Sequence, residues 1–223
     1  MSEIKQLQLQ NLAFSYPEKE LFTQVNISVD AGTIASLQGR NGTGKSTLLK
    51  CVAGLLQPTQ GSVLVNEIQL NKLEPLERSR YIGSLWTDRM RLPGFTLRDL
   101  VRMGTYNSQK ISSADEIGQV TEECLSALEI LTLADRPLHK LSDGELQKGM
   151  IARALAQQPA FLLLDEPTTY LDYIAKEDLM NTLRIISETK RIGILFTSHD
   201  LEIIRSHAND RYEMANGTVT RIS

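Results

Sequence analysis

Glycines, a lysine and a serine are concentrated in the stretch GRNGTGKS, residues 39–46, which fits the spacing G-x-x-x-x-G-K-[ST]. Glycine adopts backbone torsions that other residues avoid, so successive amides of such a loop can point at phosphate oxygens. Lys45 can bridge the β and γ phosphates of a nucleotide, and the hydroxyl of Ser46 suits Mg²⁺, which takes few protein ligands. A glycine turn with a chance lysine is the weaker alternative. The loop residues expected to contact a nucleotide are Gly39, Arg40, Asn41, Gly42, Thr43, Gly44, Lys45, Ser46 and Thr47.

Two adjacent carboxylates end the apolar run FLLLDEP. Adjacent side chains at a strand end point in different directions, so the two acids are expected to have different roles. Asp165 can reach the Mg²⁺ shell through water, and Glu166 can act as the general base on the attacking water, a role worth about 10² to 10⁴ in rate. The alternative is that the two acids are simply solvated at the end of a strand. The presence of the phosphate loop favours the functional interpretation.

A histidine and a tyrosine are further candidates for the same site. His199, in FTSHD, follows another apolar run and can reach the γ-phosphate or orient the water. Tyr16, in FSYPEK, can stack on an adenine ring. Each residue taken alone has an ordinary structural explanation, but the loop at residues 39–46 favours the functional one.

A third candidate site is LSDGE, residues 141–145. Ser142 followed three residues later by Glu145 forms a capping box, which predicts the start of a helix over ELQKGMIARALAQQ. A helix start with Ser142 and a flexible Gly144 is also suited to an anion, because its free amides and its dipole favour negative charge. A well-capped helix with no ligand remains the alternative.

The elements that must position these residues alternate between strands and helices. VNISVDAG places Val25, Ile27 and Val29 on one face of a strand, and TIASLQG is a short apolar run that ends at Gly39. AFLLLDEP and IGILFTSHD are typical of strands that are buried on both faces of a parallel sheet.

The segments after the phosphate loop switch from helix to strand and then to a mostly helical region. KSTLLKCVAGLL predicts a helix closed by Pro58, and GSVLVNEIQL predicts a strand with Val63 and Val65 on one face. From about residue 86 to 140 the pattern is mostly helical, with a capping box from Ser113 to Glu116. The apolar residues spaced as on a helix there are Ile117, Val120, Cys124, Leu125 and Leu128.

Composition narrows the class of protein. The chain has 223 residues, of which 41% are hydrophobic, enough for a sizeable core. Its 24 basic and 27 acidic residues are dispersed and give a net charge of −3, so nucleic acid is not an expected partner. Cys51 and Cys124 fall in apolar helical patterns and are expected to be small core residues. No run approaches the roughly 18 apolar residues of a membrane span, so any membrane role is expected to come through a partner.

The motifs GRNGTGKST, LSDGE, FLLLDEP, YLD and SH, in this order, resemble the ATP-binding subunits of ABC transporters over essentially the whole chain. The resemblance implies an α/β fold of the three-layer P-loop NTPase type, with an N-terminal antiparallel β part. It implies one ABC domain over residues 1–223, with a helical insertion at approximately 86–145. It also implies that residues 39–47 are the Walker A loop, 161–166 the Walker B strand and 170–172 the D-loop. His199 is then the switch histidine and Tyr16 the aromatic A-loop residue.

LSDGE matches the signature motif of that family. The resemblance implies that Ser142, Gly144 and Glu145 clamp the γ-phosphate of ATP bound by a second copy of the chain. Two copies would then face head to tail and share two composite sites that bind ATP and Mg²⁺. Hydrolysis would release the pair.

The family also implies a transmembrane permease as partner, docked against the helical insertion near residues 86–95. The chain would then be cytoplasmic and peripheral on the cytoplasmic face of the membrane. FTLRDLVRMGTYN further resembles subunits that serve importers of iron chelates, haem and cobalamin. An exporter subunit is one alternative, and an ABC ATPase that acts as a clamp on nucleic acid or ribosomes is another.

The chain departs from the family pattern at two places. The signature motif commonly reads L-S-G-G-Q, whereas Asp143 and Glu145 stand here, and added negative charge near a triphosphate is unfavourable in principle. The position of the Q-loop glutamine aligns best with Thr87, which has a hydroxyl but no carboxamide. The chain must then do without that glutamine or use Thr87 or Asp88 in the metal shell. We expect Thr87 to lie in that shell and Asp88 to substitute in part.

Overall fold

Two β-sheets organise the protein in the computed structural model, which describes residues 5–86, 93–106, 108, 111 and 113–222. A four-stranded antiparallel sheet has the order β2-β1-β4-β5, and a six-stranded sheet has the order β10-β9-β3-β8-β7-β6. In the second sheet, β3, β6, β7, β8 and β9 run parallel, and β10 is antiparallel to β9. The strands are β1 (Gln6–Tyr16), β2 (Lys19–Asp30), β3 (Ile34–Gln38), β4 (Gln60–Val65), β5 (Ile68–Gln69), β6 (Ile82–Leu85), β7 (Phe161–Asp165), β8 (Gly193–Thr197), β9 (Asp210–Ala215) and β10 (Thr218–Ile222).

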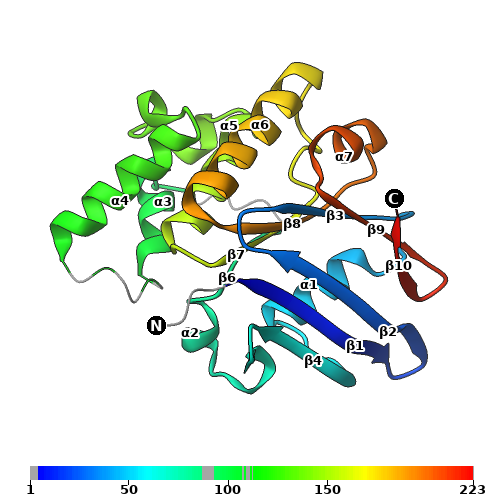
Figure 1. Cartoon of the computed structure of the whole chain (residues 1–223). Coiled ribbons are helices and arrows are strands. Elements are labelled where there is room, and N and C mark those ends of the chain that lie inside the picture. Colours follow the sequence, from blue (N-terminus) through cyan, green and yellow to red (C-terminus); the bar gives the residue numbers. More distant parts are fainter. Residues whose placement is uncertain (1–4, 87–92, 107, 109–110, 112, 223) are drawn as a thin grey trace.

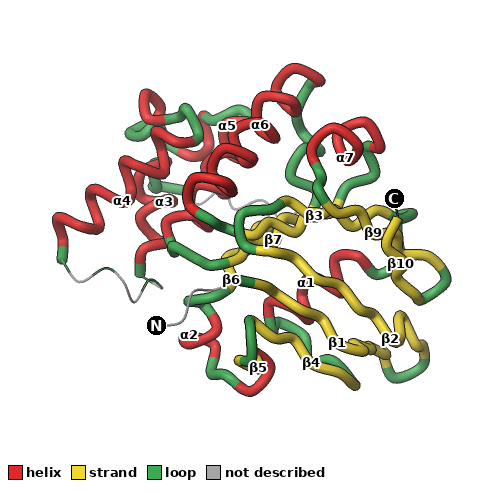
Figure 2. Tube along the Cα trace, in the orientation of Figure 1, coloured by secondary structure: helices red, strands yellow, loops and turns green. Residues whose placement is uncertain are grey.

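Helices cover both faces of the six-stranded sheet. The helices are α1 (Lys45–Ala53), α2 (Pro75–Arg78), α3 (Leu97–Thr105), α4 (Ala114–Ala127), α5 (Asp143–Ala156), α6 (Tyr173–Lys190) and α7 (Leu201–His207), with short 3-10 helices at Leu70–Lys72, Leu131–Leu133 and Leu138–Lys140. α5, α6 and α7 lie on one face, and α1 lies on the other face with the antiparallel sheet (Figure 1). Figure 2 shows the same layers by type of structure. The expected three-layer α/β fold with an antiparallel β part is confirmed.

The parallel strands are buried on both faces and separate two hydrophobic cores. Phe161 and Leu163 face the core that contains α1 and the antiparallel sheet. Leu162 and Leu164 face the core that contains α3 to α7. This alternation follows from the two-residue period of a strand, and it explains why β7 and β8 are apolar at almost every position. The expectation of two-face burial for AFLLLDEP and IGILFTSHD is confirmed.

The helix after the phosphate loop ends earlier than the sequence suggested. α1 stops at Ala53, because Gly54 adopts a left-handed conformation (φ 74°) and its N–H donates to the Cys51 carbonyl at 3.1 Å. Pro58 therefore does not close this helix, and that prediction was wrong. A glycine at the C-terminus of a helix is itself a strong stop signal.

The strand expected over GSVLVNEIQL is two strands. β4 ends at Val65 and β5 begins at Ile68, and the turn between them contains Asn66 with a positive φ of 53°. Asparagine tolerates that conformation better than most residues. Val63 and Val65 are both buried, as their alternation predicted, and so are Val25, Ile27 and Val29 in β2.

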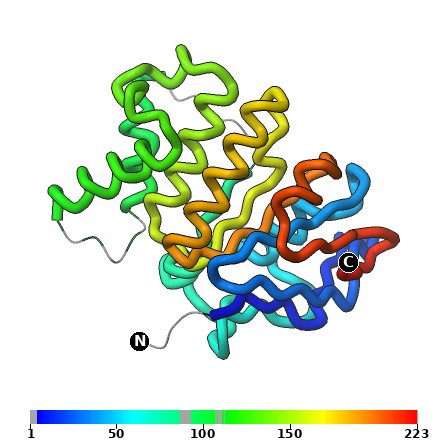
Figure 3. The backbone as a smooth tube through the Cα atoms, turned by 45° about the horizontal axis from the view of Figure 1, so that its top comes forward, coloured from blue at the N-terminus to red at the C-terminus, as the bar shows by residue number. Residues whose placement is uncertain are grey.

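The region from about residue 86 to 145 contains α3, α4 and two short 3-10 helices. The capping box at the start of α4 is confirmed, since Ser113 Oγ accepts from the Glu116 N–H at 3.2 Å and Glu116 Oε2 accepts from the Ser113 N–H at 3.2 Å. α3, α4 and α5 pack together beside the parallel sheet, away from the blue N-terminal strands (Figure 3). The boundaries of this region as a separate insertion stay a prediction. Within the described ranges, no helix has the length and apolar character that a bilayer crossing requires.

The two cysteines lie in these cores, as expected. Cys51 belongs to α1 and Cys124 belongs to α4, and both are buried in the hydrophobic cores. Burial raises the pKa of the Cys51 thiol to about 12 and that of the Cys124 thiol to about 11. Neither thiol is therefore reactive at neutral pH.

The close packing of α3 against α5 includes a glycine, Gly104. A Cβ at Gly104 would lie 2.0 Å from the backbone carbonyl oxygen of Arg153, so Gly104→Ala must push the two helices apart. We expect a loss of about 1–3 kcal/mol in the free energy of unfolding, seen as a lower midpoint in a thermal melt. Gly118→Ala in α4 is the matched control, because nothing lies within 4 Å of its Cβ and alanine favours a helix. Equal midpoints for the two variants would contradict this packing.

Candidate functional site

The loop of residues 39–46 connects β3 to α1 and is shaped by glycines. Gly42 and Gly44 have positive φ angles of 81° and 109°, and α1 begins directly after them at Lys45. Lys45 is only 6% exposed, and its ammonium donates to the carbonyls of Gly39 (2.7 Å) and Arg40 (3.3 Å). The loop therefore holds a positive charge and the free amides of a helix N-terminus at one place, which suits phosphate groups.

A cavity of about 410 Å³ lies on this loop. The residues that line it are Tyr16, Leu21, Asn41, Gly42, Gly44, Lys45, Ser46, Thr47 and Glu166. The predicted loop residues Gly39, Arg40 and Thr43 are not among them, and neither are Asp165 and His199. Thr43 instead stabilises the loop, since its hydroxyl donates to the Arg40 carbonyl at 2.9 Å.

Tyr16 lies at the rim of this cavity rather than in a core. Its side chain is 48% exposed, and its ring meets Phe14 edge to face, with centroids 5.0 Å apart. This contact leaves a ring face available for a planar group.

Asp165 joins the end of β7 to the start of α1. Its carboxylate accepts from the Ser46 hydroxyl at 3.0 Å and from the Thr197 hydroxyl at 2.8 Å, and Asp165 is 4% exposed. A carboxylate beside a hydroxyl is an all-oxygen donor set, which is the kind that Mg²⁺ prefers. The sequence predicted both residues for a metal site, and the structure brings their side chains together.

Unlike Asp165, Glu166 lines the cavity. Its backbone has a positive φ of 52°, which is uncommon outside glycine and costs of order 1–3 kcal/mol. Its N–H donates to Thr197 Oγ1 at 2.9 Å, and its carboxylate lies 2.9 Å from His199 Nδ1 and 3.4 Å from the Thr169 hydroxyl. The turn therefore places the two adjacent acids in two environments, as their different expected roles require.

Sequence reasoning missed two residues of this site. Thr197 bonds both Asp165 and the backbone of Glu166, and its position at the end of β8, two residues before His199, was an available signal. Leu21 lines the cavity from β2, and nothing in the sequence marked it. Thr87 and Asp88, expected near the metal, lie outside the described residues.

The start of α5 is a separate place, because Ser142, Gly144 and Glu145 do not line the cavity. The predicted capping box is confirmed, since Glu145 accepts from the Ser142 N–H at 2.7 Å and Ser142 Oγ accepts from the Glu145 N–H at 3.2 Å. Arg136 pairs with the Glu145 carboxylate at 3.3 Å. Hydrogen bonding to the Ser142 backbone lowers the pKa of the Glu145 carboxyl. The Glu145 carboxylate therefore interacts with the Ser142 N–H at the start of the helix and with Arg136.

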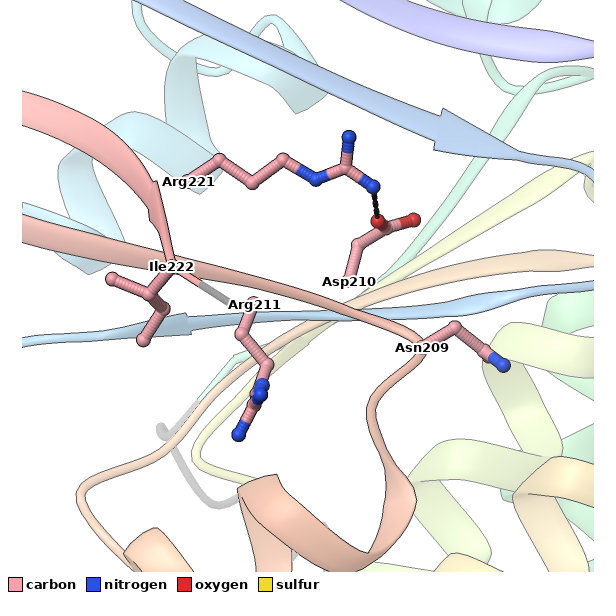
Figure 4. Close-up of a pocket in the computed structure, with 5 residues that line it drawn as sticks. All are labelled: Asn209, Asp210, Arg211, Arg221 and Ile222. Carbon is pink, nitrogen blue, oxygen red and sulfur yellow. Dashed lines mark hydrogen bonds and ion pairs between the residues drawn. The ribbon is translucent and has the colours of Figure 1, made fainter.

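A second hollow of about 410 Å³ lies at the start of β9 and the end of β10, and no residue of the phosphate loop lines it. Figure 4 shows Arg221 paired with Asp210 there, while Arg211 points away from that pair. Asp210 therefore compensates part of the positive charge in this hollow.

The family model described as ABC transporter matches residues 22–169, more than half of the chain. The chain belongs to the ABC transporter family. As an ABC ATP-binding subunit it binds ATP and is an ATPase. The residues that the family model matches include the phosphate loop, the start of α5, and Asp165 and Glu166.

Named relatives of this ABC subunit cover most of its length. The petrobactin import ATP-binding protein FpuD of Bacillus anthracis is 33% identical over 92% of this chain and 76% of that protein. The hemin import ATP-binding protein HmuV of Bordetella avium is 31% identical over 96% of this chain and 84% of that protein. Among solved structures, the ATP-binding cassette MJ0796, a dimer in a post-hydrolysis state with ADP and Pi, has a TM-score of 0.85 and 28% identity. The match covers 96% of this chain and 97% of that one.

The position of Tyr16 at the rim of the cavity predicts that its ring contributes to ATP binding by this ABC ATPase. Tyr16→Ala should weaken ATP binding by about 1–3 kcal/mol, the usual contribution of one base stacked on an aromatic ring. The measurement is an equilibrium titration with ATP and, separately, with inorganic triphosphate, whose affinity should stay the same because it has no base. Tyr16→Phe keeps the ring and is the control. Equal losses for ATP and triphosphate would remove Tyr16 from base recognition.

Proposed function

We propose that the chain hydrolyses Mg²⁺-ATP in the cavity on the phosphate loop. Lys45 and the loop amides hold the β and γ phosphates, Tyr16 stacks on the base, and Glu166 accepts a proton from the attacking water while His199 orients it. The observation that carries this proposal is the network in which Thr197 bonds both Asp165 and the Glu166 backbone beside the loop. This network holds Asp165, which contacts Ser46, and Glu166, which lines the cavity, in a fixed arrangement.

The oxygen donors of Ser46 and Asp165 fit a magnesium ion. They lie 3.0 Å apart, and a metal that keeps most of its waters needs few protein ligands. When bound, Mg²⁺ would neutralise the charge that develops on the phosphate oxygens. Thr87 is proposed to contribute to the same shell.

We further propose that two copies of the chain assemble head to tail around ATP. In this arrangement Ser142, Gly144 and the first amides of α5 face the γ-phosphate held by the other copy. The dimeric cassette with ADP and Pi supports the arrangement. The ion pair of Glu145 with Arg136 supports it as well, because it moderates the negative charge that this motif adds.

The pair is proposed to power a membrane-embedded permease at the cytoplasmic face, as part of an importer of iron chelates, haem or cobalamin. FpuD and HmuV are named as petrobactin and hemin import proteins, which supports this class of cargo. The cargo itself would cross through the permease, so its identity is not encoded in the nucleotide site.

Uptake in the source organism tests the transport role. A strain that lacks this chain should fail to accumulate one of three labelled cargoes, namely an iron chelate, haem or cobalamin. The wild-type gene should restore uptake, and the Glu166→Gln variant should not. Normal uptake of all three, together with a cargo retained in the cells, would instead favour an exporter. Co-purification of the tagged chain with ribosomes or nucleic acid would favour a clamp.

A further inference from the structure

Gln147, which no part of the proposed mechanism uses, joins α5 to the backbone next to Glu166. Its side-chain amide donates to the Pro167 carbonyl, with Nε2 and O 3.0 Å apart. Gln147 is only 9% exposed, so water does not weaken this bond. Since Pro167 follows Glu166 directly, α5 holds the peptide adjacent to the proposed general base.

A second contact ties the start of α5 to the same segment. A Cβ at Gly144 would lie 2.8 Å from Leu171 Cδ2, so the first turn of the helix lies directly against Leu171. Between Glu166 and Leu171 the chain turns tightly, with the Thr169 N–H donating to the Glu166 carbonyl at 3.3 Å. The segment 166–171 is therefore held by α5 near both of its ends.

The backbone of Glu166 needs such support. A positive φ in a residue with a side chain persists only where the surroundings enforce it. Thr197 and His199 hold Glu166 from the side of β8, at 2.9 Å each. Gln147 provides support from the side of α5, so a shift of the start of α5 acts on Glu166 through this hydrogen bond.

We propose that Gln147 is a positioning residue that couples contact at the Ser142 end of α5 to the alignment of Glu166. This inference rests on the proposed function, because the partner at Ser142 is the ATP held by a second copy of the chain. Engagement of that ATP would fix the first turns of α5 and, through Gln147 and Pro167, set Glu166 for hydrolysis of the chain's own ATP. Each copy would then reach full rate only when both sites are occupied.

Gln147→Met tests the coupling, because methionine keeps the length of the side chain but cannot donate. We expect kcat to fall about tenfold, within the roughly 10²-fold loss that a misplacement of about 1 Å causes. ATP affinity should stay the same. ATP-dependent dimerisation, measured by light scattering in the Glu166→Gln background, should also stay the same. General destabilisation would lower ATP affinity and dimerisation together with kcat. A lower kcat alone therefore indicates a positioning role.

A double variant tests whether Ser142 acts through Gln147. If it does, part of the effect of Ser142→Ala passes through Gln147, and the fold-loss of kcat caused by Ser142→Ala should be smaller in the Gln147→Met background than in the wild-type background. Multiplicative losses would overturn the proposal.

Gln157→Met is the matched control. Gln157 caps the other end of α5, and its amide donates to the Ile82 carbonyl at 2.8 Å and to the Ser79 carbonyl, so bonds of the same type are removed away from the nucleotide cavity. This variant should melt at a lower temperature but keep its kcat. The inference is wrong if Gln147→Met also keeps its kcat.

Gln147→Glu provides a second test should the methionine variant fail to fold. An ionised carboxylate repels the Pro167 carbonyl, whereas a protonated carboxyl can donate to it. The kcat of Gln147→Glu relative to wild type should therefore rise as the pH is lowered. A constant ratio would overturn the proposal. Failure of the proposed function would look different: a Glu166→Gln chain with no ATP-dependent dimer, and Ser142→Ala with normal turnover.

Discussion

Replacing Glu166 by glutamine is expected to lower kcat for ATP hydrolysis by about 10²- to 10⁴-fold, the usual contribution of a general base. Glutamine has the same backbone and size, so the positive φ at this position and the bond from its N–H to Thr197 are retained. The variant should therefore fold and bind ATP. Because ATP is no longer consumed, it should also accumulate as a dimer in ATP, visible by light scattering.

Glu123→Gln is the control for this variant. Glu123 is an exposed residue of α4 whose carboxylate accepts only from the nearby Gln119 among the described hydrogen bonds, at 2.9 Å. It should hydrolyse ATP at the wild-type rate. Brisk hydrolysis by Glu166→Gln would assign the role of general base to another group.

Lys45→Met should weaken ATP binding by about 2–5 kcal/mol, roughly 30-fold to several thousandfold, the usual loss when one partner of a buried charge pair is truncated. Lys45 is nearly buried at the start of α1, where its ammonium can meet phosphate oxygens without competing water. Methionine preserves the stem of the side chain but removes the charge. Isothermal titration with ATP under non-hydrolysing conditions measures the change.

Lys50→Met removes the same charge from the opposite end of the same helix, and it should bind ATP as wild type does. A thermal melt of both variants separates loss of binding from loss of folding. If both variants bind ATP equally well, the buried ammonium of Lys45 makes no contact with the phosphates.

The local features of this protein could be predicted from its amino-acid sequence. The phosphate loop, the capping boxes at Ser113 and Ser142, and the burial of β7 depend on residues that are close along the chain, so their spacing was enough to predict them. The end of α1 was also a local feature, and it was misassigned because Gly54, not Pro58, carries the stop signal.

Which of these features contact one another depends on the packing of the whole fold. Ser46 reaches Asp165, and His199 reaches Glu166, across more than thirty residues of chain in each case. The fold also decides which of the two cores each residue of β7 enters, because every residue of an apolar run could face either core. The bond from Gln147 to Pro167 depends on how α5 packs against the strand end. Such contacts arise from long-range packing, in which the partner of a residue is set by the whole fold and not by its neighbours in sequence.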